Sequence, residues 1–161
     1  MIQKLANATI ETGPDKTELE KAYNYAVYLL GLRLRTEGEL REKLRNKKHK
    51  TEIVDKVIRQ LEQYRYLDDR RYAEVYTENL KKYKSLGFFG IKRKLMEKRL
   101  PSQIIEEVMR ESLDEEEEIK IANKFLKKMS VSLFTQEQKA GAFRKLTARG
   151  FRGSVIGKII F

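Results

Sequence analysis

Seven positions between Ile91 and Met109 follow a spacing that recurs before and after this stretch of the chain. A shift of 51 residues in either direction places apolar residues at six of the seven positions in all three copies. The remaining position holds His49, Leu100 and Phe151. Within a copy, residues four apart and adjacent pairs fall on one side of a helix. The pattern therefore predicts an internal repeat built from helices.

Residue types that interrupt helices separate the two apolar halves of each copy. The middle copy has Pro101 and Ser102 at this point, the first has Thr51, and the last has Gly150 and Gly153. Ser102 and Thr51 belong to the residue types that favour the N-cap of a helix. Gly150 can adopt the left-handed conformation that ends one. Each copy is therefore predicted to form a helix, a tight turn and a second helix.

A third helix is expected before each pair, because an alanine, an aromatic residue and a large aliphatic residue recur there at i, i+3 and i+7. These residues are Ala22, Tyr25 and Leu29, then Ala73, Tyr76 and Leu80, then Ala122, Phe125 and Met129. The predicted fold is all-α, with three tandem three-helix repeats of about 51 residues that form an elongated, curved array. Stacked neighbours would complete one another's cores, since one repeat buries little by itself.

Capping signals help to place the repeats along the chain. Thr17 with Glu20 and Thr36 with Glu39 have the spacing of capping boxes, so each pair is expected to open a helix. The first of these helices should run to about Arg35. The resulting division is an N-terminal arm over residues 1–16, followed by repeats over residues 17–66, 67–113 and 114–161.

Composition limits the cellular setting of the protein. Cysteine is absent and histidine occurs once, which leaves no disulfide framework and few metal ligands. No apolar run approaches the roughly 20 residues that span a bilayer. The first residues also lack the basic start and apolar core of a signal peptide. We therefore expect a soluble cytoplasmic monomer that binds no membrane.

Positive charge is spread over every predicted repeat. The chain has 35 basic and 24 acidic residues, a net charge of +11, and the three repeats carry +4, +3 and +4 in order. Such a distribution favours a polyanionic partner, most plausibly nucleic acid or a nucleoprotein. The alternative is a solvent-exposed helical surface with surplus lysine and no such partner.

The densest positive charge lies between Asn79 and Arg99, where Glu97 is the only acidic residue. Phosphate groups require basic side chains in no particular sequence. The predicted basic surface consists of Lys81, Lys82, Lys84, Lys92, Arg93, Lys94, Lys98 and Arg99, joined by Arg33, Arg35 and Lys48 from the first repeat.

Tyr83, Phe88 and Phe89 are interleaved with these basic residues. On a nucleic-acid surface they could stack on bases. Phe88 and Phe89 could equally pack beneath the loop, whereas a contiguous apolar tip would favour contact with a protein. No zinc-finger spacing, basic leucine zipper or RNA-recognition signature accompanies them, so the sequence offers no device for reading bases.

Clustered carboxylates raise the possibility of an active site. Asp68 and Asp69 are adjacent, and Asp114 precedes four consecutive glutamates. Both clusters coincide with predicted helix starts, where a carboxylate caps free amides or favours the positive end of the helix dipole. The helix-start interpretation is therefore preferred over catalysis.

Neither His49 nor the segment from Gly153 to Lys158 supports an enzyme or a cofactor site. His49 could bind a metal or transfer protons, but its place in the repeat favours a half-buried packing residue. The segment Gly153–Lys158 resembles a phosphate-binding loop, yet the spacing is too short and Ile159 replaces the serine or threonine that holds magnesium. No catalytic residue, metal site or cofactor is predicted.

Three ordered groups of residues resemble the signatures of the RecX family of recombination regulators. The first group is Leu29, Leu30, Arg33, Arg35, Thr36, Glu37, Glu39, Leu40, Lys43 and Leu44. The second group is Leu67, Asp68, Asp69, Arg70, Tyr72 and Ala73, and the last is Arg149, Gly150, Phe151, Val155 and Ile156. The resemblance extends over nearly the whole chain.

This resemblance implies a bacterial cytoplasmic protein made of tandem three-helix repeats. It implies binding to the RecA recombinase and to its filament on DNA, with restraint of filament growth, ATP hydrolysis and strand exchange. The chain departs from the family pattern at Gly87, Phe88, Phe89 and Gly90, where other members more often have glycine followed by proline or basic residues. It departs again at Arg99, where glycine usually ends the helix.

Two functions remain in view. In the first, a non-catalytic regulator lies along a RecA filament and contacts protein and single- or double-stranded DNA together, with several weak modules acting through avidity. In the second, the chain is a helical protein that binds DNA non-specifically and has no dedicated protein partner. Comparison of its affinity for bare DNA with its affinity for RecA-coated DNA distinguishes the two.

Overall fold

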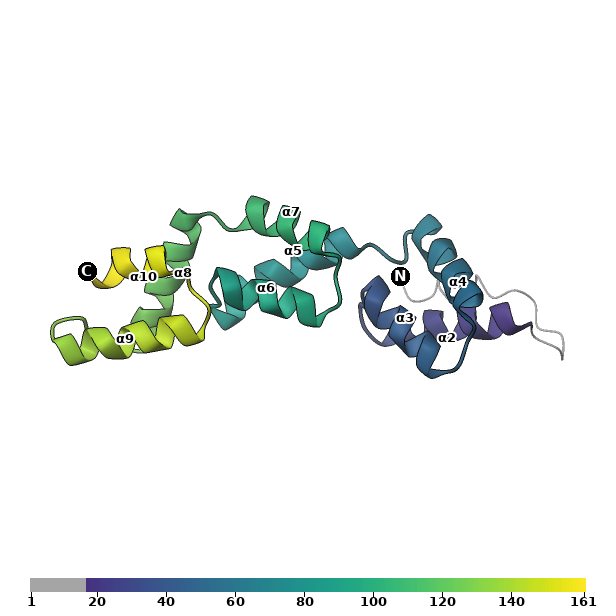
Figure 1. Cartoon of the computed structure of the whole chain (residues 1–161), viewed down its shortest axis with the longest axis horizontal. Coiled ribbons are helices and arrows are strands. Elements are labelled where there is room, and N and C mark those ends of the chain that lie inside the picture. The colour runs from purple at the N-terminus through teal and green to yellow at the C-terminus, as the bar shows by residue number, and fades with distance from the viewer. Residues whose placement is uncertain (1–16) are drawn as a thin grey trace. The chain divides into compact units, whose positions relative to one another are not determined.

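Residues 17–161 are the part of the chain that the structure, a computed structural model, describes (Figure 1). They fold into helices joined by short turns, and no strand occurs among them, so the all-α prediction is confirmed for these residues. The N-terminal arm expected over residues 1–16 lies outside the described residues. The helices are α2 (Glu18–Leu32), α3 (Glu37–Asn46), α4 (Thr51–Gln63), α5 (Asp69–Asn79), the π-helix η1 (Leu80–Lys84), α6 (Phe88–Glu97), α7 (Ser102–Ser112), α8 (Glu115–Lys128), α9 (Gln136–Ala148) and α10 (Gly153–Ile160).

The helix starts repeat at the predicted interval only in part. Helix α5 begins at Asp69, 51 residues after α2 begins at Glu18. Helix α8 begins at Glu115, only 46 residues after α5. The chain divides into two compact units, one ending at Tyr72 and the other spanning Ala73–Phe161. The division into three repeats with one common period stays a prediction.

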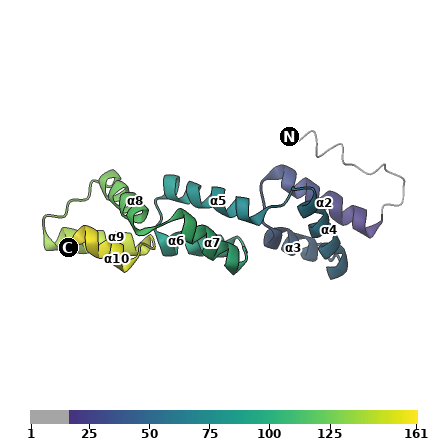
Figure 2. The same ribbon diagram turned by 90° about the horizontal axis from the view of Figure 1, so that it is seen from above.

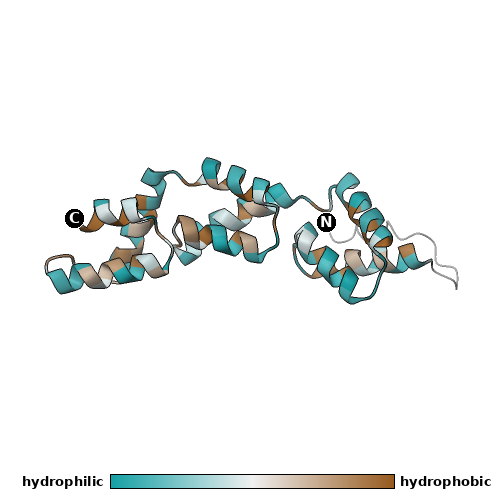
Figure 3. Ribbon diagram, viewed as in Figure 1, coloured by the Kyte–Doolittle hydropathy of each residue, from teal (hydrophilic) through white to brown (hydrophobic). Residues whose placement is uncertain are grey.

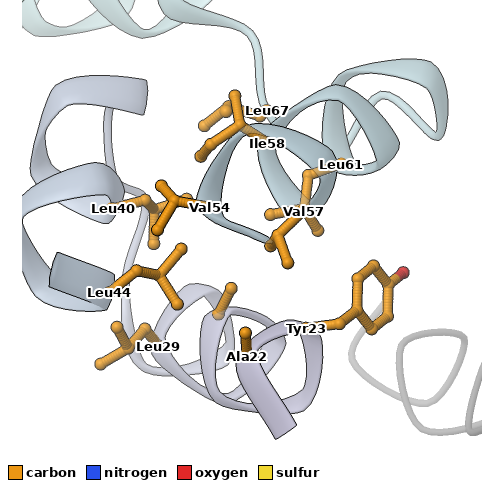
Figure 4. Packing of buried hydrophobic residues seen from close by; sticks show 11 residues of the cluster. Ala22, Tyr23, Leu29, Leu40, Leu44, Val54, Val57, Ile58, Leu61 and Leu67 are labelled. Carbon is orange, nitrogen blue, oxygen red and sulfur yellow. The ribbon is translucent and has the colours of Figure 1, made fainter. Parts of the chain in front are cut away.

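Helices α2, α3 and α4 pack against one another in the first unit. Their buried side chains form one cluster, which Figure 4 shows between the three helices. Leu44 is fully buried there, and truncating such a leucine to alanine typically costs about 2–5 kcal/mol of stability. The buried residues from these helices are Ala22, Tyr23, Ala26, Leu29, Leu40, Leu44, Val54, Val57, Ile58 and Leu61, and Leu67 joins them from the segment before α5.

Both predicted capping boxes are present. The Thr17 hydroxyl accepts a hydrogen bond from Glu20 N at 3.3 Å, and the Glu20 carboxylate accepts one from Thr17 N at 2.8 Å. Thr36 and Glu39 make the same reciprocal bonds at 3.2 and 3.3 Å. Helix α2 ends at Leu32, earlier than the predicted Arg35, because Arg33 adopts an extended conformation.

Two predicted caps are wrong. Thr51 and Ser102 are the first helical residues of α4 and α7, and the N-cap positions belong to Lys50 and Pro101. Neither N-cap residue makes a side-chain capping bond. The backbone is already extended at Lys50 and Pro101, with ψ of 146° and 139°, so the helices start one residue earlier than the capping signal suggested.

The second unit contains η1 and helices α6 to α10, with most of α5. Helix α6 packs on α7, and α10 packs on both α8 and α9; Figures 1 and 2 both show α9 and α10 side by side. Figure 3 shows that these helices carry both hydrophobic and hydrophilic residues. The repeated apolar positions are buried at Ile91, Leu95, Leu100, Ile105, Val108, Met109, Ala142, Leu146, Phe151, Val155, Ile156 and Ile160.

Met129 is an exception to the predicted core. It was expected on the same buried face as Ala122 and Phe125, which are 0% and 5% exposed. Met129 is 48% exposed instead. Helix α8 ends at Lys128, so Met129 is the C-cap residue and lies beyond the last helical turn.

Left-handed residues follow helices α3, α6 and α9. Lys48, Arg99 and Gly150 have φ of 63°, 58° and 76°. The prediction that Gly150 adopts this conformation at a helix end is confirmed. Only at Gly150 does packing also demand glycine, because a Cβ atom there would lie 2.1 Å from the backbone nitrogen of Gly90. Arg99 therefore tolerates a side chain where Gly150 does not.

Candidate functional site

The most basic segment of the chain begins in the π-helix η1. Leu80 is buried, whereas Lys82, Tyr83 and Lys84 are exposed. A π-helix is a local widening of a helix that is frequently found at functional sites. Ser85 then adopts a left-handed conformation with φ of 48°, and the chain turns into α6. This turn places the exposed residues of η1 directly before the basic helix α6.

Helix α6 has no side-chain cap of its own, and other parts of the second unit supply its acceptors. Gly87 is the N-cap residue, and its N–H donates to the carbonyl oxygen of Arg149 at 3.1 Å. Phe89 N donates to the carbonyl oxygen of Gly150 at 2.8 Å. The amides at the start of α6 are thus satisfied by the carbonyl groups at the end of α9. A Cβ atom on Gly87 would lie 2.4 Å from the backbone of Phe151, so glycine permits this close approach.

Glu118 completes the joint between these helices. Its side chain is fully buried, and Oε1 accepts hydrogen bonds from the backbone amides of Phe88 and Arg152, each at 2.9 Å. The other carboxylate oxygen pairs with Arg152 Nε. One buried carboxylate therefore caps the starts of α6 and α10 together. Because its charge is matched by three donors, its burial is tolerated.

The acidic residues from Asp114 to Glu118 were interpreted from the sequence as carboxylates at a helix start. This interpretation is confirmed for Asp114 and incomplete for Glu118. Asp114 is the N-cap of α8, and its carboxylate accepts from Glu117 N at 2.7 Å. Glu118 instead serves other helices. Its position four residues before Ala122 and seven before Phe125 puts it on the apolar face of α8. That register was the signal in the sequence that distinguished Glu118 from the other glutamates.

Lys81 is mainly a structural residue. Its side chain is 11% exposed. The ammonium group donates to the Glu78 carboxylate at 2.8 Å and to the backbone carbonyl of Ser112 at 2.9 Å. Lys81 thus ties η1 to the end of α7, which leaves little of it available to a partner.

The residues that remain accessible are concentrated in η1 and α6. Lys82, Lys84 and Arg93 are exposed, and Lys92 is half-buried. Lys82 lies over the ring of Tyr83, with Nζ 5.2 Å from the ring centroid. Tyr83 is 64% exposed, so the pair presents a cation beside an accessible aromatic ring.

The basic residues at the end of α6 have partners within the chain. Lys94 forms an ion pair with Glu97 at 2.7 Å, and this hydrogen bond holds the pKa of the Glu97 carboxyl below its usual value. Lys98 Nζ lies 5.6 Å from the ring centroid of Tyr76. Arg99 is exposed in its left-handed turn. Their charges contribute to the local field, but Lys94 and Lys98 are already engaged.

The two phenylalanines have different environments. Phe88 is half-buried, and the Arg152 guanidinium carbon lies 5.0 Å from its ring centroid. Phe89 is 57% exposed and meets Phe88 edge to face, with ring centroids 5.4 Å apart. The packing interpretation applies to Phe88, whereas Phe89 is accessible to a partner.

Three predicted residues lie in the first unit. Arg33 binds both carboxylate oxygens of Glu39, at 3.0 and 3.1 Å, and this hydrogen bonding raises the pKa of the guanidinium. Arg35 Nε donates to the backbone carbonyl of Leu29 at 3.2 Å, near the end of α2. Lys48 is exposed at the end of α3. Arg33 and Arg35 are therefore engaged in holding the first unit together.

Asp69 has a role that its position at a helix start did not indicate. Asp68 caps its own helix by accepting from Arg71 N at 2.9 Å, as predicted. Asp69 Oδ1 instead accepts from the amide of Glu37, the first residue of α3, at 2.8 Å. Its other oxygen is buried without a hydrogen-bond partner in the described chain. Burial raises the pKa of the Asp69 carboxyl to about 6.

His49 is half-buried, as expected from its place in the repeat. Its side chain is 12% exposed, and Nδ1 lies 2.6 Å from Oε1 of Glu18. Within residues 17–161, no three His, Cys, Asp or Glu side chains are grouped so that they could hold a metal ion. None of the helices in this range combines the length and apolar character that crossing a membrane requires.

Comparison with known proteins relates the chain to one family. The family model described as the first three-helix domain of RecX matches residues 22–61, and the second three-helix domain matches residues 68–109. Regulatory protein RecX of Bacillus velezensis is 34% identical over 142 residues, which cover 86% of this chain and 54% of that protein. Regulatory protein RecX of Deinococcus radiodurans is 32% identical over 132 residues, covering 82% of this chain and 63% of that protein. The chain thus spans a little more than half the length of these curated relatives.

Solved structures share the fold. The crystal structure of RecX from Lactobacillus salivarius superposes with a TM-score of 0.77 at 24% identity, covering 89% of this chain and 94% of that one. A second crystal structure, of a regulatory protein RecX, gives a TM-score of 0.72 at 20% identity and covers 98% of this chain and 84% of that one.

Proposed function

Because the chain belongs to the RecX family of regulatory proteins, we propose that it regulates homologous recombination in the cytoplasm by binding RecA and the RecA–DNA filament. In this role it restrains filament extension, ATP hydrolysis and strand exchange, as a monomer without catalysis or a cofactor of its own. The observation that carries the proposal is the tandem match of two RecX three-helix domains, at residues 22–61 and 68–109.

Exposed cations in the second unit support a polyanionic partner. Lys82, Lys84 and Arg93 present positive charge to solvent from η1 and the middle of α6. Such groups bind phosphates through charge and release counterions, so each contact adds about 0.9 to the salt-dependence slope for duplex DNA. We define the revised basic surface as Lys82, Lys84, Lys92 and Arg93, with Arg99 at its edge.

Restraint of a filament requires no chemistry. A protein that occupies a surface needed by an incoming RecA protomer, or by the second DNA strand, stops growth by exclusion. Several weak contacts on one chain then act at high effective concentration along a polymer of identical sites. Loss of any one contact weakens the whole interaction more than its individual affinity suggests.

A second function, non-specific DNA binding without a dedicated protein partner, is favoured by one observation. The exposed residues of the revised basic surface are lysines and arginines, whose positive charge alone suffices for binding the backbone of any DNA. Equal affinity for bare and RecA-coated DNA at moderate salt would favour this function. Tighter binding to the coated filament favours the regulator.

A charge-reversal experiment tests the regulator. The triple variant Lys82→Glu, Lys84→Glu and Arg93→Glu is expected to lose most of its restraint of RecA ATP hydrolysis on single-stranded DNA, with its helicity retained. The matched control reverses three exposed charges on α8 and α9 of the same unit, Lys124→Glu, Arg144→Glu and Lys145→Glu. Equal loss in both variants would assign the effect to net charge and refute the surface. A wild-type chain that leaves RecA ATP hydrolysis unchanged would refute the proposed function.

A further inference from the structure

A pocket of about 450 Å³ lies among α6, α7 and the starts of α8 and α10. Its apolar lining comes from Phe88, Met109 and Leu113. Met109 and Leu113 are each 2% exposed, and Phe88 is half-buried, so part of its ring remains accessible. The volume falls within the range of about 300–1,000 Å³ that is typical of small-molecule sites.

Three of the six charged side chains around the pocket already have partners. Arg152 pairs with Glu118, Glu115 pairs with Lys158 at 2.8 Å, and Asp114 caps α8. Three lining residues are uncommitted: Lys92 on α6, and Glu106 and Arg110 on α7. No hydrogen bond or ion pair to any other residue of the described chain engages these three side chains. The pocket therefore offers two free cations, one free carboxylate and an apolar lining.

This combination matches the chemistry of a nucleotide. An apolar lining with an aromatic ring accommodates the flat face of a base, a contact worth a substantial part of single-strand affinity. A lysine and an arginine suit a phosphate group. A free carboxylate can accept a hydrogen bond from the exocyclic amino group of cytosine, adenine or guanine, as acidic side chains do with cytosine in duplex DNA.

Other occupants use the pocket less completely. A basic side chain of a protein partner would face Lys92 and Arg110, which repel it. An acidic side chain would satisfy the cations and leave the apolar lining and Glu106 unused. A purely apolar side chain would desolvate the free charges without pairing them, which is unfavourable.

We propose that this pocket binds one unstacked nucleotide of single-stranded DNA, with the base against Phe88, Met109 and Leu113. Arg110 and Lys92 hold the adjoining phosphate, and Glu106 accepts from the amino group of the base. The inference rests on the proposed function, since it assumes a DNA strand near the revised basic surface. Lys92 belongs to both the pocket and that surface, and its neighbour Arg93 is exposed on the same helix, so flanking phosphates have cations nearby.

Binding of fluorescein-labelled single-stranded oligonucleotides by the full chain tests the pocket. Arg110→Ala should weaken binding by about tenfold, the usual scale for losing one charge-assisted contact. The control Arg144→Ala removes the same charge from an exposed site on α9, outside the pocket lining, and should weaken binding by about twofold or less through screening. Glu106→Ala should reduce the preference for oligo-dC over oligo-dT, since thymine has no exocyclic amino group.

Methyl NMR signals of Met109 and Leu113 locate the ligand directly. They should shift on addition of oligo-dC, and an oligonucleotide whose sugars lack bases should leave them unshifted. Unshifted signals with oligo-dC, or equal losses in Arg110→Ala and Arg144→Ala, would overturn the pocket even if the protein restrains RecA. If free dCMP saturated the pocket at the same concentration as the oligonucleotide, the pocket would be a site for free nucleotides, and the assignment to single-stranded DNA would be wrong. If Arg110→Ala weakened only binding to RecA-coated filament, the occupant would be a protein side chain and the proposal would be wrong. Shifted signals in a protein without effect on RecA would retain the pocket and refute only the proposed function.

Discussion

Replacing Asp69 by asparagine should change the stability of the first unit in a pH-dependent way. The free energy of unfolding of the variant, relative to that of wild type, should rise as the pH goes from acidic to neutral. The Asp69 carboxylate accepts a hydrogen bond from Glu37 N at 2.8 Å, and its second oxygen is buried without a partner in the described chain. Asparagine keeps an acceptor oxygen of the same size at this position and removes the negative charge. The comparison across pH isolates that charge, because packing differences between the two side chains are common to every pH.

The magnitude follows from the shifted pKa. Burial raises the pKa of Asp69 from 3.8 to about 6. The native state therefore binds more protons than the unfolded state between these values, so wild-type stability falls as pH rises through this window and levels off above about pH 6. Two pKa units correspond to about 3 kcal/mol at most. Water screens a half-buried carboxylate, so we expect the stability difference between Asp69→Asn and wild type to grow by about 1–2 kcal/mol from about pH 4.5 to about pH 7.5.

Urea unfolding followed by circular dichroism at each pH measures this difference. Asp55→Asn is the control in the same unit, because the hydrogen bond from Arg41 holds the pKa of Asp55 below its usual value. Its stabilising contribution is present above pH 4 and is lost only as pH falls below it, so its effect should stay constant over the tested range. A constant difference between Asp69→Asn and wild type, or one that shrinks as pH rises, would refute the burial argument.

Two further predictions concern the joint at the start of α6. Gly150→Ala should destabilise the second unit by about 2–4 kcal/mol, because its Cβ would clash with Gly90 and its φ of 76° disfavours alanine. The control Gly141→Ala lies in open space within α9 and should instead stabilise the second unit by about 0.5–1 kcal/mol. Similar changes in the free energy of unfolding of the two variants in urea would contradict the close approach of Gly150 to the backbone of Gly90. Glu118→Ala should lower the free energy of unfolding by about 3–5 kcal/mol, because it leaves Arg152 and two backbone amides unpaired. A loss below about 1 kcal/mol in urea unfolding would show that these bonds contribute little.

Local signals in the sequence predicted the local structure well. The capping boxes at Thr17 and Thr36 depend on residues three apart, and both are present. The apolar periodicity likewise identified the buried faces of α3, α4, α6 and α7, because side chains three and four apart share a helical face. The caps at Thr51 and Ser102 failed because the residues before them were already extended, which a preference for capping residues does not reveal.

The candidate site depends on contacts that local patterns do not contain. Asp69 resembled an ordinary acidic residue at a helix start, and the register of Glu118 indicated its burial but not its partners. Their hydrogen-bond donors Glu37 and Phe88 lie 32 and 30 residues away. In the sequence, Lys81 is one of eight basic residues in its segment. The structure shows that its ammonium group donates to the backbone carbonyl of Ser112, which lies 31 residues further along the chain. Charge density along the chain identified the region, but the three-dimensional fold decides which of its charges are available.

The first amides of α6 are capped by residues that come later in the chain, and this affects the order in which the protein can fold as it leaves the ribosome. Helix α3 carries its own capping box, and its packing partners α2 and α4 are complete by Gln63, so the first unit can form early in synthesis. Helix α6, which carries Lys92 and Arg93, must wait for acceptors at Glu118, Arg149 and Gly150. Until those residues emerge, the nascent chain has a finished N-terminal unit and an α6 helix whose first amides lack their acceptors.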